Sequence, residues 1–132
     1  MEIDFRSLLL ADPDLAALVG VRVDWLLRPQ SDPTPSIVLT IVSAPISYTI
    51  NAPSVLQRSV VQVDVYGTTY LEMHDAREAL IALISAFSGT VGSTHFDSIF
   101  VTAHRQTKEN GKIAETTFFR DSLDLTIQHK GV

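Results

Sequence analysis

The chain has 132 residues, of which 45% are hydrophobic and 19% are charged, with a formal net charge of −5 and no cysteine. This length and composition are typical of one globular domain, here residues 1–132, and exclude a disordered or membrane-spanning chain, a disulfide scaffold and a thiolate metal site. The acidic balance argues against a basic stripe that grips nucleic-acid phosphates, but not against DNA that passes through a ring built from the chain.

The first 20 residues predict two short helices. Residues 3–11 place apolar side chains on one helical face. Asp12 is a good N-cap and Pro13 suits the first helical position, so a second helix should run over residues 13–19 and end at Gly20. The acidic start of the chain has the wrong charge for a secretory leader, and we therefore expect the protein to stay in a cytoplasm.

Two strands are expected next. Residues 21–27 alternate between the two faces, with Val21, Val23, Trp25 and Leu27 on one of them. Residues 28–35 hold three prolines and should form a loop. Residues 37–42 are apolar on both faces, which is typical of a central strand or of an edge strand covered by a neighbouring chain.

Residues 44–57 contain two prolines and show no clear period. A loop of this length is usually functional, and its apolar side chains suit a segment that orders against a partner. An irregular arm, or an extension of the flanking strands into a long hairpin, remains equally open. The candidate inter-subunit contacts in this segment are Ile46, Tyr48, Ile50, Val55 and Leu56.

Residues 58–87 give the clearest local pattern, a strand followed by a long helix. Thr69 and Glu72 have the spacing of a capping box at the helix start. The helix should continue to Phe87 and stop at residues 88–89. The expected core places one face of the strand against one face of the helix, and consists of Val61, Val63 and Val65 packed on Met73, Leu80 and Ile84.

The last third predicts a hairpin. Residues 88–94 resemble a flexible connection, and residues 96–108 form a long strand. Asn110 and Gly111 are typical of a type I′ turn, and they complete the set of candidate inter-subunit contacts. The return strand runs from residue 113 to about residue 129, and Asp121 at an apolar position should mark a break, a bulge or an edge.

These elements predict an α+β fold. We expect a mostly antiparallel sheet of about five strands, with one long helix packed on a face and short N-terminal helices. The strand–helix–strand crossover could add one parallel or next-but-one pair.

No catalytic, cofactor-binding or metal site is predicted. The histidines at positions 74, 95, 104 and 129 have no metal-ligand spacing, and neighbours such as His74 and Asp75 should point about 100° apart on a helix. Asp121 and Asp124 should face opposite sides of a strand. The chain also lacks the glycine-rich phosphate loops and nucleophile motifs of known enzyme classes. An enzymatic or small-molecule-binding domain stays open as an alternative. It predicts a closed pocket with converging polar groups, for which the vicinity of His104 and Arg105 is one candidate place.

Five segments, in order, resemble one family. They are residues 5–20 (FRSLLLADPDLAALVG), 35–38 (PSIV), 61–66 (VQVDVY), 69–83 and 120–125 (RDSLDL). Together they are similar to the tail completion, or tail terminator, proteins that join head to tail in long-tailed bacteriophages and gene transfer particles.

The resemblance implies an α+β subunit that assembles with itself into a ring, usually a hexamer, at the head–tail junction of a virion tail. Such a ring ends polymerisation of the tail tube protein and receives a head completion or neck protein. DNA crosses it only in transit, and neither a membrane nor a cofactor takes part. The family has no known catalytic residues. A neck connector or tail tube subunit of the same particle is the alternative.

Overall fold

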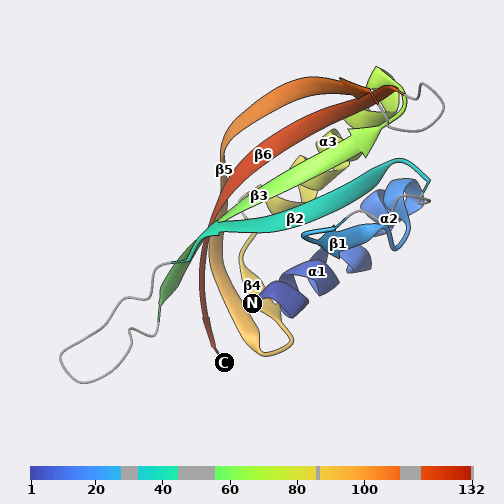
Figure 1. Ribbon diagram of the computed structural model, residues 1–132. Helices are drawn as coiled ribbons and strands as arrows, with labels where there is room; N and C mark the ends of the chain where they lie inside the picture. Colours follow the sequence, from blue (N-terminus) through green and yellow to red (C-terminus); the bar gives the residue numbers. More distant parts are fainter. Residues whose placement is uncertain (28–32, 45–55, 86, 111–116, 132) are drawn as a thin grey trace.

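The computed structural model describes residues 1–27, 33–44, 56–85, 87–110 and 117–131. Within this part, three helices and six strands follow one another along the chain (Figure 1). Their bounds are α1 (Glu2–Ala11), α2 (Pro13–Val19), β1 (Val23–Trp25), β2 (Ser36–Ser43), β3 (Gln57–Gly67), α3 (Tyr70–Ile84), β4 (Gly89–Val91), β5 (Thr94–Asn110) and β6 (Thr117–Gly131).

The strands form one sheet in the order β1-β2-β3-β6-β5-β4. The pair β1–β2 is parallel, and every other pair is antiparallel. The α+β class and the mostly antiparallel sheet are therefore confirmed, but the sheet has six strands in place of about five. The added strand is β4, which pairs with the start of β5 in a segment that the sequence assigned to a flexible connection.

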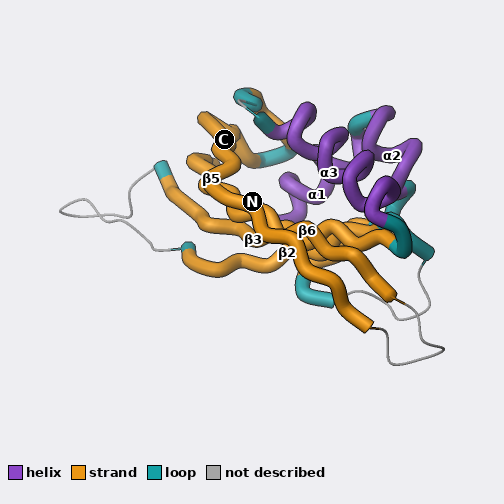
Figure 2. Tube along the Cα trace, turned by 90° about the horizontal axis from the view of Figure 1, so that it is seen from above, coloured by secondary structure: helices purple, strands orange, loops and turns teal. Residues whose placement is uncertain are grey.

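The helices cover one face of the sheet (Figure 2). Helix α3 lies on β3 and β6, and α1 contacts both β1 and β4. Because β1 and β4 are the two ends of the strand order, the sheet must curl around α1, as the arched strands of Figure 1 show. All six residues of the expected core are buried, namely Val61, Val63, Val65, Met73, Leu80 and Ile84.

Strand β2 lies between β1 and β3, so the central-strand interpretation of residues 37–42 is correct where the strand is paired on both sides. Ile37 and Leu39 are fully buried in the core, and Val38 on the opposite face is 8% exposed. Val42, beyond the segment paired with β1, is 59% exposed.

The predicted caps are present. Thr69 Oγ1 accepts a hydrogen bond from the Glu72 amide at 3.2 Å, and Asp12 Oδ2 accepts one from the Leu15 amide at 2.9 Å. Glu72 reaches back to the amide of Thr68, at 3.3 Å, and not to that of Thr69. A Cβ added to Gly67 would lie 2.8 Å from the Met73 nitrogen, so only glycine fits this turn from strand to helix.

Two predicted boundaries are wrong. Helix α3 ends at Ile84, because the chain turns extended at Ser85 and Phe87 packs its ring against Phe96 of β5. The strand predicted over residues 21–27 shrinks to β1, because Leu26 takes a positive φ of 67° and leaves the extended conformation.

Asp121 was expected at a break, a bulge or an edge, and this expectation is also wrong. It pairs in register with Val65 of β3 on one side and Gln106 of β5 on the other, and its side chain is fully buried. The irregularities of the β5–β6 pair lie in β5, between Phe96 and Ser98 and between Val101 and Ala103. A carboxylate can occupy this position because α3 supplies its counter-ion, as described below.

Candidate functional site

Most of the predicted contact residues lie outside the described part of the chain. These are Ile46, Tyr48, Ile50, Val55 and Gly111. Leu56 immediately precedes β3 and is 41% exposed, and Asn110 is the last residue of β5. Their role in contacts between subunits therefore stays a prediction.

His104 and Arg105 do not converge on one pocket. Their side chains extend to opposite sides of β5, where His104 Nδ1 lies 3.4 Å from Asp121 Oδ1 and Arg105 Nη1 lies 2.7 Å from Asp124 Oδ2. Asp121 and Asp124 thus face opposite sides of the sheet, as the sequence predicted. His104 and Arg105 therefore do not form the polar pocket that the small-molecule alternative places near them.

A buried ion pair ties α3 to the sheet. Arg77 Nη1 donates to Asp121 Oδ2 at 2.8 Å, and Gln106 Nε2 donates to the same oxygen at 3.2 Å. Burial acts to lower the pKa of Arg77, but hydrogen bonds to Asp121 and Glu78 outweigh it, and the net pKa is raised. The Arg77 guanidinium therefore stays charged between α3 and the sheet. The pair joins residues 44 positions apart and fixes how α3 sits on β6.

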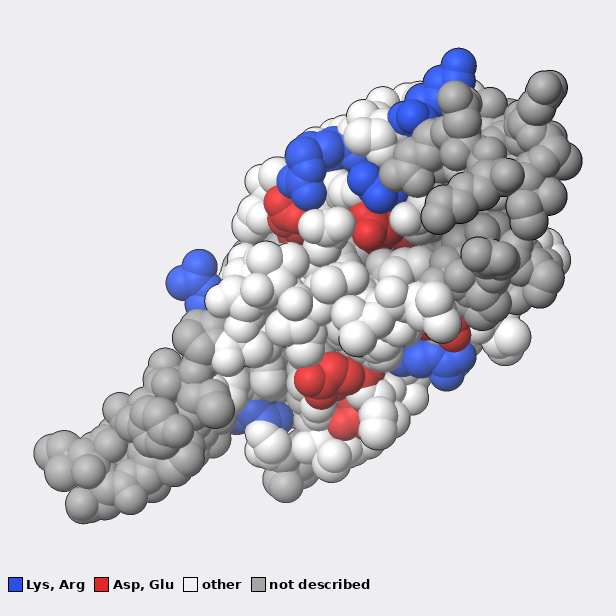
Figure 3. All heavy atoms as spheres, viewed as in Figure 1, with Lys and Arg blue, Asp and Glu red and all other residues white. Residues whose placement is uncertain are grey.

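The face of the sheet without helices carries a polar network. Gln62 donates to both carboxylate oxygens of Asp64 at 3.2 Å, and Ser122 Oγ donates to Asp64 Oδ1. Hydrogen bonds to Asp124 raise the pKa of Arg105 on the same face. Figure 3 shows Lys and Arg atoms in several separate groups, some of them beside Asp and Glu, with broad uncharged surface between them. The described part of that view carries no continuous basic stripe of the kind that grips nucleic acid.

The histidines have local partners. His74 Nδ1 lies 3.3 Å from Asp75 Oδ1, so the expectation that these neighbours would point apart is wrong. His95 contacts Thr90 at 2.8 Å and Asp97 at 3.2 Å. Within the described residues, no group of three or more His, Cys, Asp or Glu side chains could hold a metal ion.

The surroundings of His129 affect its protonation. Its Nε2 lies 2.9 Å from the buried Ser59 Oγ. Burial lowers the pKa of His129, and the N-terminal amino group lowers it further. The neutral ring is therefore favoured in the folded protein, and this Ser–His contact joins β3 to β6.

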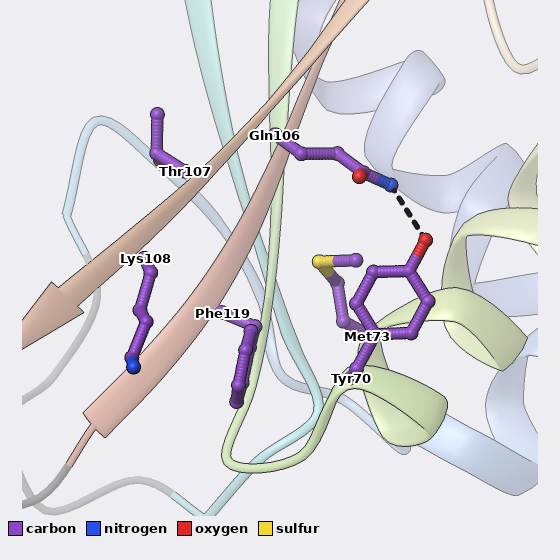
Figure 4. Close-up of a pocket in the computed structure, with 6 residues that line it drawn as sticks. All are labelled: Tyr70, Met73, Gln106, Thr107, Lys108 and Phe119. Carbon is purple, nitrogen blue, oxygen red and sulfur yellow. Dashed lines mark hydrogen bonds between the residues drawn. The ribbon is translucent and has the colours of Figure 1, made fainter.

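An open, mainly apolar hollow of about 250 Å³ lies beside the start of α3. Figure 4 shows its lining residues, which come from α3, β5 and β6 and are Tyr70, Met73, Gln106, Thr107, Lys108 and Phe119. The Tyr70 and Phe119 rings meet edge to face, with centroids 6.3 Å apart. Gln106 Nε2 donates to the Tyr70 hydroxyl at 3.1 Å. We call these six residues the apolar hollow.

Large apolar side chains are exposed in the residues that precede and follow β1. Val21 is 74% exposed, Leu26 is 77% exposed and Leu27 is 68% exposed. The Leu26 amide donates to the Leu39 carbonyl and the Leu27 amide to the Trp25 carbonyl, each at 2.8 Å, so the backbone here is held in place. We call Leu26 and Leu27 the leucine knob. The sequence pattern missed the knob, because no glycine or asparagine signals the positive φ of Leu26.

The helices of the described part include none that is long and apolar enough to cross a membrane. No family model matches the chain, and no curated protein matches it by sequence.

Solved structures do share the fold. A chain from the virion of a native gene transfer agent particle superposes with a TM-score of 0.63 at 16% identity, covering 99% of this chain and 95% of that one. A second solved chain superposes with a TM-score of 0.54 at 13% identity, covering 99% of this chain and 92% of that one. At these identities the likeness establishes a common fold over the whole described chain.

Proposed function

We propose that this chain is a structural component of a phage-like particle, and specifically a ring-forming subunit at the head-proximal end of the tail. In this role it ends polymerisation of the tail tube and joins the tail to the head. Its partners are further copies of itself, the tail tube protein and a head completion or neck protein. DNA passes through the ring without tight binding.

The observation that carries the proposal is the end-to-end likeness to a gene transfer agent virion chain, with a TM-score of 0.63 over 99% of this chain. A shared fold alone does not fix a function. The five ordered sequence segments that resemble tail terminator proteins support the same kind of particle, and they are the reason for proposing this role in it.

The arrangement of polar groups supports a role in contact and not in catalysis. In the described residues, the buried charges at Arg77 and Asp121 bond to each other and hold α3 on the sheet. Asp64 and Asp124 are likewise held by Ser122 and Arg105 on the other face. A catalytic site usually leaves a nucleophile or a base aimed at a reacting atom, whereas these groups already have partners that fix the fold.

The test is assembly of the full chain. Size-exclusion chromatography with light scattering should give a closed homo-oligomer, which negative-stain electron microscopy should show as rings. Added to the polymerising tail tube protein of the same particle, the chain should shorten the tubes and appear at one end of each. A protein that stays monomeric both alone and with the tube protein would refute the proposal.

The three alternatives give different results in the same experiments. A tail tube subunit would polymerise by itself into long tubes. A neck connector would bind the head side of a tail that is already closed, without changing tube length. An enzyme or small-molecule carrier would stay monomeric, and its melting temperature would rise with the right ligand.

A further inference from the structure

Leu26 has a backbone conformation that is costly for its residue type, and the subunit gains backbone hydrogen bonds from it but no burial of the Leu26 side chain. Its φ of 67° lies in the left-handed region, which is uncommon for residues other than glycine and asparagine. The conformation leaves the side chain 77% exposed, so the strain secures no burial within the subunit. Strained residues that serve no packing role are often placed for binding, and here the strain presents two adjacent leucines to solvent.

The apolar hollow has the size and chemistry to receive such side chains. At about 250 Å³ it is smaller than the roughly 300–1,000 Å³ typical of small-molecule pockets. Met73, Tyr70 and Phe119 supply apolar and aromatic surface, and Phe119 and Tyr70 fix each other by their edge-to-face contact. A hollow of this kind suits an aliphatic anchor from a protein partner better than a polar metabolite.

Charge is complementary between the two features. Lys108 lines the hollow, and Asp24 stands two residues before Leu26 in β1. Neither side chain forms an ion pair with another described residue. Seating the knob in the hollow of a second copy would bring the Asp24 carboxylate toward the Lys108 ammonium group, which favours one orientation of docking.

The geometry points to a head-to-tail contact between copies of this chain, in which the leucine knob of one copy occupies the apolar hollow of the next and Asp24 of the first pairs with Lys108 of the second. The knob directly follows β1, whereas the hollow is formed by α3, β5 and β6. The two are therefore different surfaces of the subunit. A contact between two different surfaces repeats from copy to copy and closes into a ring when the rotation allows it. The inference rests on the proposed ring function and specifies its interface.

The first experiment removes the knob without harming the fold. In the variant L26N/L27N, asparagine tolerates a positive φ and both positions are exposed, so circular dichroism and the melting temperature should match the wild type. The matched control is I3N, which changes an apolar residue that is 81% exposed on α1. We expect L26N/L27N to associate about 30-fold more weakly, the effect of losing an interface anchor, while I3N assembles normally.

The second experiment tests the pairing of the two surfaces. D24K and K108E should each weaken assembly, and the double variant D24K/K108E should restore it, because the charges are exchanged across the contact. Mixing L26N/L27N, which keeps an intact hollow, with K108E, which keeps an intact knob, should give a 1:1 dimer by light scattering. A wild type that forms rings, together with a 1:1 dimer in this mixture, indicates a head-to-tail contact, since the mixture contains one competent interface.

The outcomes separate this inference from the proposed function. If the wild type forms rings and L26N/L27N forms the same rings, the interface assignment is wrong while the ring function stands. If L26N/L27N forms rings but no longer shortens tubes, the knob binds the tube protein and the inference is again overturned. If the wild type is monomeric with and without the tube protein, both proposals fail.

Discussion

Replacing Arg77 by methionine should leave the Asp121 carboxylate buried without its cation. The Asp121 side chain is fully buried and the Arg77 side chain is 10% exposed, so solvent cannot replace the lost partner. Gln106 still donates to Asp121, but an amide does not neutralise a charge, and His104 Nδ1, 3.4 Å from Asp121 Oδ1, does so only when it is protonated. Breaking a buried pair in this way costs about 3–5 kcal/mol of unfolding free energy.

This loss of unfolding free energy can be converted into a decrease in the melting temperature. An unfolding entropy of about 2.1 cal/mol/K per residue gives roughly 0.28 kcal/mol/K for this chain. R77M should therefore lower the melting temperature by about 11–18 °C, measured by circular dichroism at pH 7. The double variant R77M/D121L, which replaces both charges by apolar groups, should recover much of the loss because no unpaired charge remains.

The matched control is R105M. Arg105 and Asp124 form an equally short pair, at 2.7 Å, but the Arg105 side chain is 53% exposed. Solvent screens such a pair, so R105M should change the melting temperature little. If R77M melted like R105M, or if R77M/D121L were no more stable than R77M, the buried pair would not be what holds α3 on the sheet.

Two further predictions concern His129 and Gly67. The pKa of His129 is lowered from 6.5, mainly by burial, so below pH 6.5 the unfolded chain takes up the proton more readily than the folded one. The contribution of His129 to stability should be full above pH 6.5 and decrease as the pH falls through the pKa of the folded state. H129Q should flatten this part of the profile of melting temperature against pH. A wild-type profile that is already flat there would contradict the lowered pKa of His129. G67A should destabilise the fold by about 1–3 kcal/mol in urea unfolding, because its Cβ would lie 2.8 Å from backbone of α3; unchanged stability would mean that the turn can open without cost.

The unit from β3 to α3 could be predicted from the sequence because its signals are local. Alternation over Val61, Val63 and Val65 and the capping spacing of Thr69 lie within a few residues, and the structure contains both. Strand β4 could not be predicted in the same way. It has three residues, begins with Gly89, and is a strand only because β5 offers it a partner.

The role of Asp121 depends on distant residues, which explains why the sequence pattern failed there. A carboxylate at an apolar position is costly unless a cation meets it. Its cation is Arg77, on a helix 44 positions earlier. Local periodicity assigned α3 an apolar face but contains no information about which residue of β6 that face meets, so the pattern could indicate only an irregularity. Leu26 is similar, since the hydrogen bond from its amide to Leu39 depends on how β1 lies beside β2.

The buried pair and the apolar hollow are mechanically connected through Gln106. Its side-chain nitrogen donates both to Asp121 Oδ2, at 3.2 Å, and to the Tyr70 hydroxyl, at 3.1 Å. The contact that holds α3 on β6 therefore also sets the distance between the two walls of the hollow, with Tyr70 on one wall and Phe119 on the other. A binding surface whose walls are fixed by the core loses little conformational entropy when a partner docks. A subunit that must join identical neighbours in one fixed orientation has reason to build its interface on such a support, and not on its loops alone.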